Sequence, residues 1–295
     1  MDALSVLLEG LIDYAGLFPP ASRSMEEAVG DYAAYRSGPR AAWLGRFVLP
    51  AARLDAFRAA RQGMPGTAGP WRLSALLGDS SEADLERVIA FNQAAHASAS
   101  PAAIVDAIEM KAATPEDIER LEALTPAGVT ACFEIPIREP GPFLAALAKG
   151  DGRAKFRAGG VVPEAIPAAA DIARFLAACA AARMPFKATA GLHHPFRSLR
   201  PLTYAADAPQ AMMHGFINVF LAAAFAYQGM DVATLTALLN EESPQAFAFG
   251  KTKVGWRGHS LPAERLREAR GAFALAFGSC SFEEPRQDLE AAGWL

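Results

Sequence analysis

The sequence contains only three cysteines, Cys132, Cys179 and Cys280, and no CxxC pair. An odd number of widely spaced cysteines predicts neither a disulfide framework nor a zinc finger, and is typical of the reducing cytoplasm. A basic block is also missing. The formal net charge is -4 at pH 7, which argues against a nucleic-acid partner or an anionic membrane surface. We therefore expect a cytoplasmic protein.

Long hydrophobic runs and nucleotide-binding motifs are missing as well. The longest apolar run, residues 215–227, is shorter than the roughly 20 residues that span a bilayer. The N-terminal segment MDALSVLLEGLID is acidic, whereas a signal peptide begins with positive charge. No GxGxxG follows the first predicted strand and no GxxxxGK[ST] occurs. The sequence thus predicts no membrane span, no leader and no cofactor.

What the chain does have is a regular alternation of apolar, strand-like segments and amphipathic, helix-like segments. Strands are predicted over 11–20, 43–50, 71–78, 103–112, 129–137, 154–160 and 185–192, and an eighth over 246–256. Helices are predicted over 24–38, 51–64, 80–96, 114–124, 140–150, 166–183 and 261–278. Ser24 and Glu27 have the spacing of a capping box, and Thr114 precedes Pro115 as a cap precedes a first helical residue.

This alternation predicts a parallel sheet, and seven or eight repeats favour a closed (β/α)8 TIM barrel over an open sheet. We expect one barrel domain over 1–295, with 260–295 as a C-terminal helix and tail.

Two of the predicted strands share one pattern, a lysine followed four residues later by glycine. The segments are AKFRAGG and PFKATAG, with Lys155 and Lys187. Alternate side chains of a strand face the same way, so Lys155 shares a face with Arg157, and Lys187 with Thr189. Strands between helices are usually apolar on both faces. A lysine in each therefore indicates a reactive or anion-binding site.

Polar residues also occur where the other predicted strands end, which is where barrel enzymes have their active sites. The whole set is Asp13, Tyr14, Glu109, Lys111, Glu134, Lys155, Arg157, Lys187, Thr189, His193 and His194. Its slight excess of cations suits a small metabolite that bears a carboxylate or phosphate. The alternative is a set of ion pairs inside the barrel without chemistry. Because buried charges are costly unless well paired, the set as a whole favours a site.

The two lysines are the candidate nucleophiles. A lysine among apolar groups and near a second cation has a lowered pKa, which frees its amine to form a Schiff base with a carbonyl. We expect this of Lys187 or Lys155, with Glu134 or Glu109 moving the proton. The alternative is that one lysine only neutralises a glutamate.

His193 and His194 are adjacent, so on an extended segment they point in opposite directions. Either is expected to assist proton transfer or to hydrogen-bond the substrate. A metal ion held by one of them with Glu134, Glu109 or His214 is the alternative, although no HxH or HExxH spacing supports it.

Arg157, followed by Gly159 and Gly160, predicts an anion-binding site. An arginine can hold an oxyanion bidentately, and glycines let backbone amides approach it. A plain tight turn is the alternative.

The last third of the chain adds two features. His214 and Asn218 are four residues apart in a nearly all-apolar helical run, so they are expected on one face, either toward the pocket or as a buried core pair. Cys280 lies in the turn GSCSFEE without a neighbouring nucleophile motif, and we do not predict it to be a nucleophile. That turn and the tail could close over the barrel mouth as a lid.

The motifs DYAGLFPPA, KFRAGG, FKATAGLHHPFR, HGFINVFLAA and FGSCSFEEP resemble those of a family of uncharacterised bacterial α/β-barrel-like proteins, which brings no assigned activity. KFRAGG and KATAG are also similar to the two lysine strands of the deoxyribose-phosphate aldolase group of class I aldolases. This resemblance implies that Lys155 is the Schiff-base lysine and Lys187 the partner that lowers its pKa. Arg157 stands where those aldolases have a small hydroxyl residue, and Leu192 follows Gly191 where a second glycine is expected. Which lysine reacts stays open.

Together these patterns predict an enzyme that acts on a small anionic carbonyl compound by aldolase-, lyase- or isomerase-type chemistry. Two alternatives are a metal-dependent barrel lyase or hydrolase, and a barrel that binds an anionic metabolite without transforming it. A homo-oligomer is compatible with the sequence.

Overall fold

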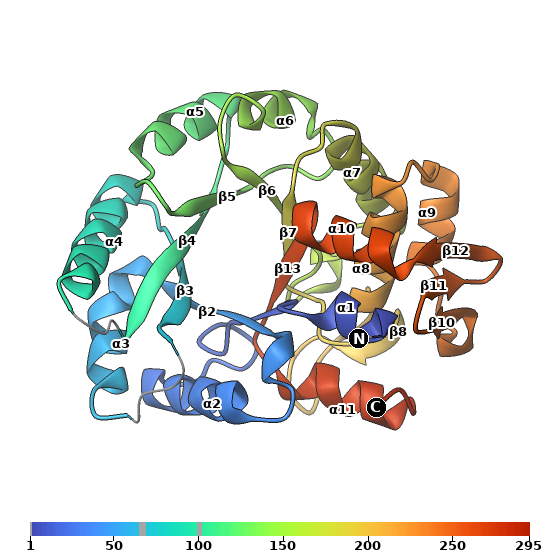
Figure 1. Ribbon diagram of the computed structural model, residues 1–295, viewed down its shortest axis with the longest axis horizontal. Coiled ribbons are helices and arrows are strands. Elements are labelled where there is room, and N and C mark those ends of the chain that lie inside the picture. Colours follow the sequence, from blue (N-terminus) through green and yellow to red (C-terminus); the bar gives the residue numbers. More distant parts are fainter. Residues whose placement is uncertain (1, 65–68, 99–101) are drawn as a thin grey trace.

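Eight parallel strands close into a barrel in the computed structural model, which describes residues 2–64, 69–98 and 102–295 (Figure 1). Around the barrel the strands follow the order β1-β13-β7-β6-β5-β4-β3-β2. They are β1 (Ile12–Tyr14), β2 (Leu44–Pro50), β3 (Trp71–Leu76), β4 (Ala103–Lys111), β5 (Thr130–Glu134), β6 (Arg153–Arg157), β7 (Phe186–Thr189) and β13 (Ala274–Ser279). The predicted (β/α)8 barrel is confirmed.

Helices alternate with these strands and form the outer layer (Figure 1). They are α1 (Ala3–Leu8), α2 (Met25–Ser37), α3 (Leu54–Arg61), α4 (Ser81–His96), α5 (Pro115–Leu124), α6 (Gly141–Leu147), α7 (Ala169–Ala181), α8 (Phe216–Tyr227), α9 (Val232–Leu239), α10 (Ala263–Ala272) and α11 (Glu283–Ala291). Both predicted helix starts are confirmed. Ser24 and Glu27 form a capping box, and Thr114 caps α5 with Pro115 in its first turn.

The eighth barrel strand is not where the sequence predicts it. Residues 246–256 contribute to a separate antiparallel sheet of β10 (Phe247–Phe249), β11 (Lys253–Trp256) and β12 (His259–Pro262). The turn at Arg257 and Gly258 is too short for a parallel crossover, so the strands that it joins pair antiparallel. The helix predicted over 261–278 ends at Ala272, and the chain continues into β13, which pairs with β1 and β7.

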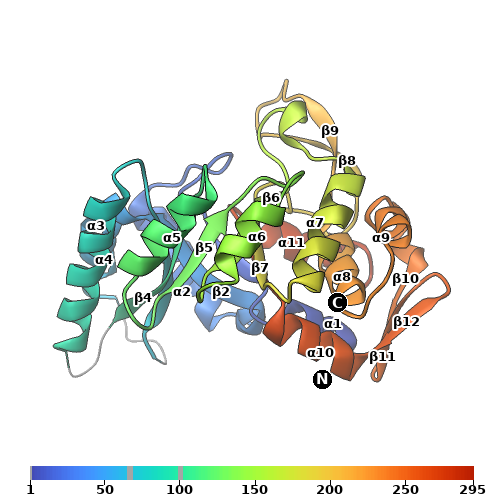
Figure 2. The same cartoon turned by 90° about the horizontal axis from the view of Figure 1, so that it is seen from above.

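A long excursion between β7 and α8 covers the carboxyl end of the barrel. It contains a hairpin of β8 (Ser198–Pro201) and β9 (Gln210–Met213), which Figure 2 shows projecting beyond that end. The helix that follows, α8, is buried along nearly its whole length because α7, α9 and α10 pack around it. No helix in the described ranges is both long and apolar enough to cross a membrane.

Candidate active site

A cluster of paired charges fills the carboxyl end of the barrel interior. We call Asp13, Glu109, Glu134, Lys155, Arg157 and Lys187 the charge cluster; it brings together residues from β1, β4, β5, β6 and β7. The register causes this meeting, because Glu134 is paired with Lys155 across β5 and β6, and Lys155 with Lys187 across β6 and β7. Side chains at equivalent positions of neighbouring parallel strands point the same way.

Glu109 is the centre of the cluster. Its Oε1 lies 2.5 Å from Lys187 Nζ and its Oε2 lies 2.9 Å from Lys155 Nζ. The Ser74 hydroxyl donates a hydrogen bond of 2.7 Å to Oε1. Lys187 Nζ also lies 2.5 Å from Asp13 Oδ2, and Lys155 Nζ lies 3.2 Å from Glu134 Oε2. One carboxylate thus bridges two lysines, each of which has a second carboxylate of its own.

For Glu109 and Lys187, burial and pairing act on the pKa in opposite directions, and pairing has the larger effect. Burial alone would raise the pKa of Glu109, but Lys155 and Lys187 hold it far below its usual range. Burial alone would lower the pKa of Lys187, but Asp13 and Glu109 raise it above its usual value. The expected lowering of the Lys187 pKa by a second cation is therefore wrong, because carboxylates lie closer to the amine.

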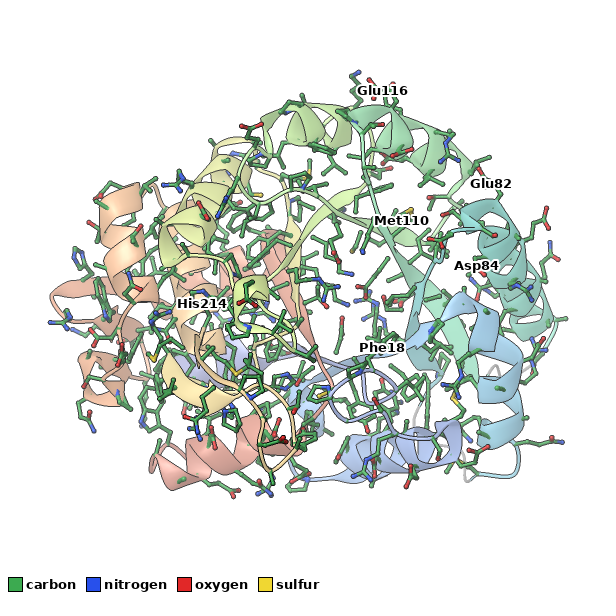
Figure 3. All side chains as sticks on the ribbon, turned by 180° about the vertical axis from the view of Figure 1, so that it is seen from behind. Phe18, Glu82, Asp84, Met110, Glu116 and His214 are labelled. Carbon is green, nitrogen blue, oxygen red and sulfur yellow. The ribbon has the colours of Figure 1, made fainter. Side chains whose placement is uncertain are left out.

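A cavity of about 450 Å³ lies directly above the charge cluster and below the β8–β9 hairpin. Its polar lining contains Glu109, Lys155, Arg157, Gly159, Gly160, Thr189, His193 and Cys280. Its apolar lining includes Phe18 on the loop after β1, which Figure 3 shows beside the barrel opening. Of the two core lysines, Lys155 is the one that lines the cavity.

A second cavity of about 360 Å³ adjoins the first and shares Glu109, Lys155 and Arg157 with it. It adds Glu134 and the exposed Lys111. Burial alone would raise the pKa of Glu134, but Lys155 and Arg157 lower it. Lys155 therefore stands between two spaces that a small molecule can enter, with a carboxylate on each side.

The residues of the predicted anion-binding site lie at the rim of the main cavity. Arg157 is half-exposed, and its Nε lies 3.4 Å from Glu134 Oε1. Within the described residues, no backbone or side-chain acceptor takes the N–H of Gly159 or Gly160. Gly159 also packs against Gly191: a Cβ on Gly191 would lie 2.8 Å from the Gly159 Cα. These glycines let two loops touch and leave amide groups available beside a cation.

The adjacent histidines have different partners, although both line a smaller cavity beside the main one. His193 lines the main cavity, whereas His194 Nδ1 lies 2.7 Å from Asp288 Oδ2, on α11 and outside that cavity. Burial lowers the pKa of His194. Burial alone would also lower the pKa of His193, but contacts with Cys280 and Glu284 raise it to about 9.

Four residues predicted to bind substrate lie outside the main cavity's lining: Tyr14, Asn218, His214 and Asp13. Tyr14 is buried and donates to Asp31 at 3.0 Å, and its pKa is raised by burial and by that carboxylate. Asn218 donates to the carbonyls of Leu238 and Glu241 at 2.9 Å and 2.8 Å. Both side chains have protein partners and hold elements together.

His214 does not share a helical face with Asn218, because α8 begins at Phe216. Its Nε2 lies 2.7 Å from the Pro167 carbonyl, and burial lowers its pKa to about 4. In Figure 3 it lies among the helices to one side of the barrel opening. The remaining predicted residue, Asp13, lies beneath the cavity as a partner of Lys187.

The alternative hypothesis, a metal ion held by one of the adjacent histidines with Glu134, Glu109 or His214, is not supported by the arrangement of these side chains. In the described part of the chain, no group of three or more His, Cys, Asp or Glu side chains is arranged to hold a metal ion. Glu109 and Glu134 face lysines, and His193 faces Glu284 at 3.3 Å.

Cys280 is named in the sequence analysis but not placed in the site, whereas the structure puts it in the lining of the main cavity. It follows β13 directly, lines the main cavity, and its Sγ lies 3.9 Å from His193 Nδ1. Placing the eighth strand on 274–279 would have put Cys280 at a strand end, where site residues are expected.

No family model and no curated protein matches the chain. The chain's fold is the TIM barrel, an architecture that is commonly enzymatic, with active sites at the carboxyl ends of the strands.

Proposed function

We propose that the protein is an enzyme that cleaves or rearranges a small anionic carbonyl compound through an imine on Lys155. The observation that carries the proposal is the position of Lys155, in both cavities and between Glu109 and Glu134. Lys187 lines neither cavity, and Asp13 and Glu109 hold it as an ammonium group.

The groups around Lys155 match the proton transfers of imine formation. The Lys155 ammonium passes a proton to Glu134, whose Oε2 lies 3.2 Å from Nζ. The free amine attacks the carbonyl carbon, the π-electron pair moves to oxygen, and water leaves after that oxygen is protonated. The cationic imine is stabilised by Glu109, which already holds the Nζ charge at 2.9 Å. The cationic imine then accepts the electron pair of the substrate C–C or C–H bond that breaks.

The other side of the cavity suits the anionic end of the substrate. Arg157 and the N–H groups of Gly159 and Gly160 offer positive charge and hydrogen-bond donors to a carboxylate or phosphate. His193 faces the same space and is the one of the two histidines that can assist there. The placement of Lys155 on β6 and Lys187 on β7 also agrees with the roles that the resemblance to class I aldolases implies.

Reductive trapping tests this proposal. The protein is treated with sodium borohydride in the presence of pyruvate, dihydroxyacetone phosphate or glyceraldehyde 3-phosphate, and the modified peptide is identified by mass spectrometry. We expect one of these carbonyl probes to be fixed on Lys155. Lys155→Met should abolish trapping, whereas Lys149→Met, which changes an exposed lysine paired with Glu119, should leave it unchanged. Equal labelling of Lys149 and Lys155 would overturn the proposal.

One observation favours a second candidate, a barrel that binds an anionic metabolite without transforming it. Both core lysines are already paired with carboxylates, and the pKa of Lys187 is raised. This candidate predicts that phosphate or pyruvate raises the melting temperature, while no probe is trapped on Lys155.

A further inference from the structure

Cys280 does not stand alone at the mouth of the barrel. The nearest ring atom of His193, Nδ1, lies 3.9 Å from Cys280 Sγ and 3.3 Å from Glu284 Oε2. The hydroxyl of Ser279 lies 3.3 Å from the same nitrogen and itself donates to the Ser281 carbonyl at 2.7 Å. A thiol, an imidazole and a carboxylate therefore meet at one ring atom.

Three elements build this group, and two of them belong to the barrel end. Cys280 follows β13, His193 follows β7, and β13 and β7 are neighbours in the sheet. Glu284 is in the first turn of α11, the helix that follows Cys280 after a short turn. Tyr204, on the β8–β9 hairpin, approaches from above, with its hydroxyl 3.9 Å from Sγ.

The arrangement has the parts that activate a nucleophile: a thiol, a cationic imidazolium within reach that stabilises its thiolate, and a carboxylate that holds the imidazolium. Glu284 faces Nδ1 and favours its protonated form, which is consistent with a His193 pKa raised to about 9 despite burial. The thiol is accessible only from the cavity, because Cys280 is buried elsewhere and lines that space. Lys155 and Arg157 line the same space and attract anions.

We propose that Cys280, with His193 and Glu284, forms a second reactive site in the cavity, which takes small anionic electrophiles. The thiol proton passes to water, and the His193 imidazolium, held by Glu284, stabilises the thiolate. The sulfur lone pair forms a bond to the electrophilic carbon. With an aldehyde carboxylate, the carbonyl π pair moves to oxygen, which takes a proton from the imidazolium and leaves a thiohemiacetal; the imidazole then regains a proton from water. With a haloacetate, the halide leaves with the bonding pair.

The other two cysteines provide an internal comparison. Cys132 lies inside the barrel, where burial and Glu109 raise its pKa to about 11. Cys179 is fully buried in α7, and burial raises its pKa as well. Neither lines the main cavity. A reagent that enters the cavity should therefore distinguish Cys280 from both.

Alkylation with iodoacetate and iodoacetamide tests the site without any substrate. The rate at each cysteine is followed by mass spectrometry of the native protein. We expect Cys280 to react at least about tenfold faster than Cys132 and Cys179. Relative to free glutathione, it should prefer the anionic iodoacetate over the neutral iodoacetamide. His193→Gln should slow the reaction at Cys280 about tenfold, and Glu284→Gln should slow it less.

Two control variants keep the test decisive. Tyr227→Phe removes only a hydroxyl that accepts from Arg183, away from the cavity lining, and should leave the alkylation rate within about twofold. Lys155→Met should weaken the preference for iodoacetate but leave Cys280 reactive toward iodoacetamide. Reactivity of Cys280 no greater than that of Cys132, or unchanged in both His193→Gln and Glu284→Gln, would overturn the proposal. Failure of borohydride trapping with Cys280 still reactive would count against the Lys155 chemistry alone.

Discussion

Replacing Glu109 with glutamine removes the carboxylate that bridges the two core lysines while keeping the size of the side chain. Three carboxylates balance three cations in the charge cluster, so the variant leaves the cluster with one excess positive charge and takes one of two carboxylates from each buried lysine. Removing one partner of a buried ion pair destabilises by about 3–5 kcal/mol. We expect the lower value, about 3 kcal/mol, because Lys187 keeps Asp13 at 2.5 Å and Lys155 keeps Glu134 at 3.2 Å.

The assay is thermal unfolding followed by circular dichroism at pH 7. For a chain of this size, about 3 kcal/mol corresponds to a fall in melting temperature of about 6–12 °C. Glu119→Gln is the matched control, since it breaks an exposed pair with Lys149 and should cost less than about 1 kcal/mol. If Glu109→Gln unfolds at the same temperature as Glu119→Gln, the cluster does not depend on its central carboxylate and the reasoning fails.

Further predictions concern a glycine contact, a histidine titration and a buried amide. Gly191→Ala should destabilise more than Gly229→Ala. Both residues have positive φ, which costs about 1–2 kcal/mol for alanine, but only the Cβ at 191 would meet backbone, 2.8 Å from the Gly159 Cα. Equal melting temperatures of the two variants would contradict the close contact. The raised His193 pKa adds stability that is complete below the unfolded value of 6.5 and is lost as the pH rises through about 9. The gap in melting temperature between wild type and His193→Gln should therefore narrow from pH 6 to pH 10, and a constant gap would refute the assigned contacts. Asn218→Ala should lower stability by about 3 kcal/mol, because it leaves buried backbone groups without partners. It should leave the cavity's affinity for phosphate unchanged in a calorimetric titration, since Asn218 lies outside the cavity lining.

The strands that carry the lysines were predictable because short apolar runs bounded by helix-like segments are a local signal. The strand β13 could not be predicted from local sequence, and the reason is physical. Its sequence, ALAFGS, contains no β-branched residue and begins with good helix formers, and only Phe273 separates it from α10. The segment 246–256 carries Thr252 and Val254 and has the stronger strand propensity. Barrel closure, not local preference, makes 274–279 a strand.

The candidate site shows the same limit. Lysines at strand ends could be found from the sequence, because position along a strand determines which face a side chain takes. The residues that pair with these lysines could not be found in this way. Asp13 and Lys187 come from opposite ends of the repeat and meet only through closure, and Cys280 reaches His193 only because β13 lies beside β7. Which lysine faces the cavity depends on the depth of each side chain in the barrel, which no spacing encodes.

The position of β13 between β1 and β7 also has a consequence for the order in which the protein folds. Before residues 274–279 are available, β1 and β7 present two unpaired strand edges, and such edges can pair with other chains. The ion pair between Asp13 and Lys187 spans this same gap, so the carboxylate and the lysine stay apart until the last strand is inserted. During synthesis from the N-terminus, the barrel of the first seven strands therefore cannot close until the eighth strand has been made. We expect a slow, late closing step dominated by contacts between distant parts of the chain, with aggregation competing most strongly just before it.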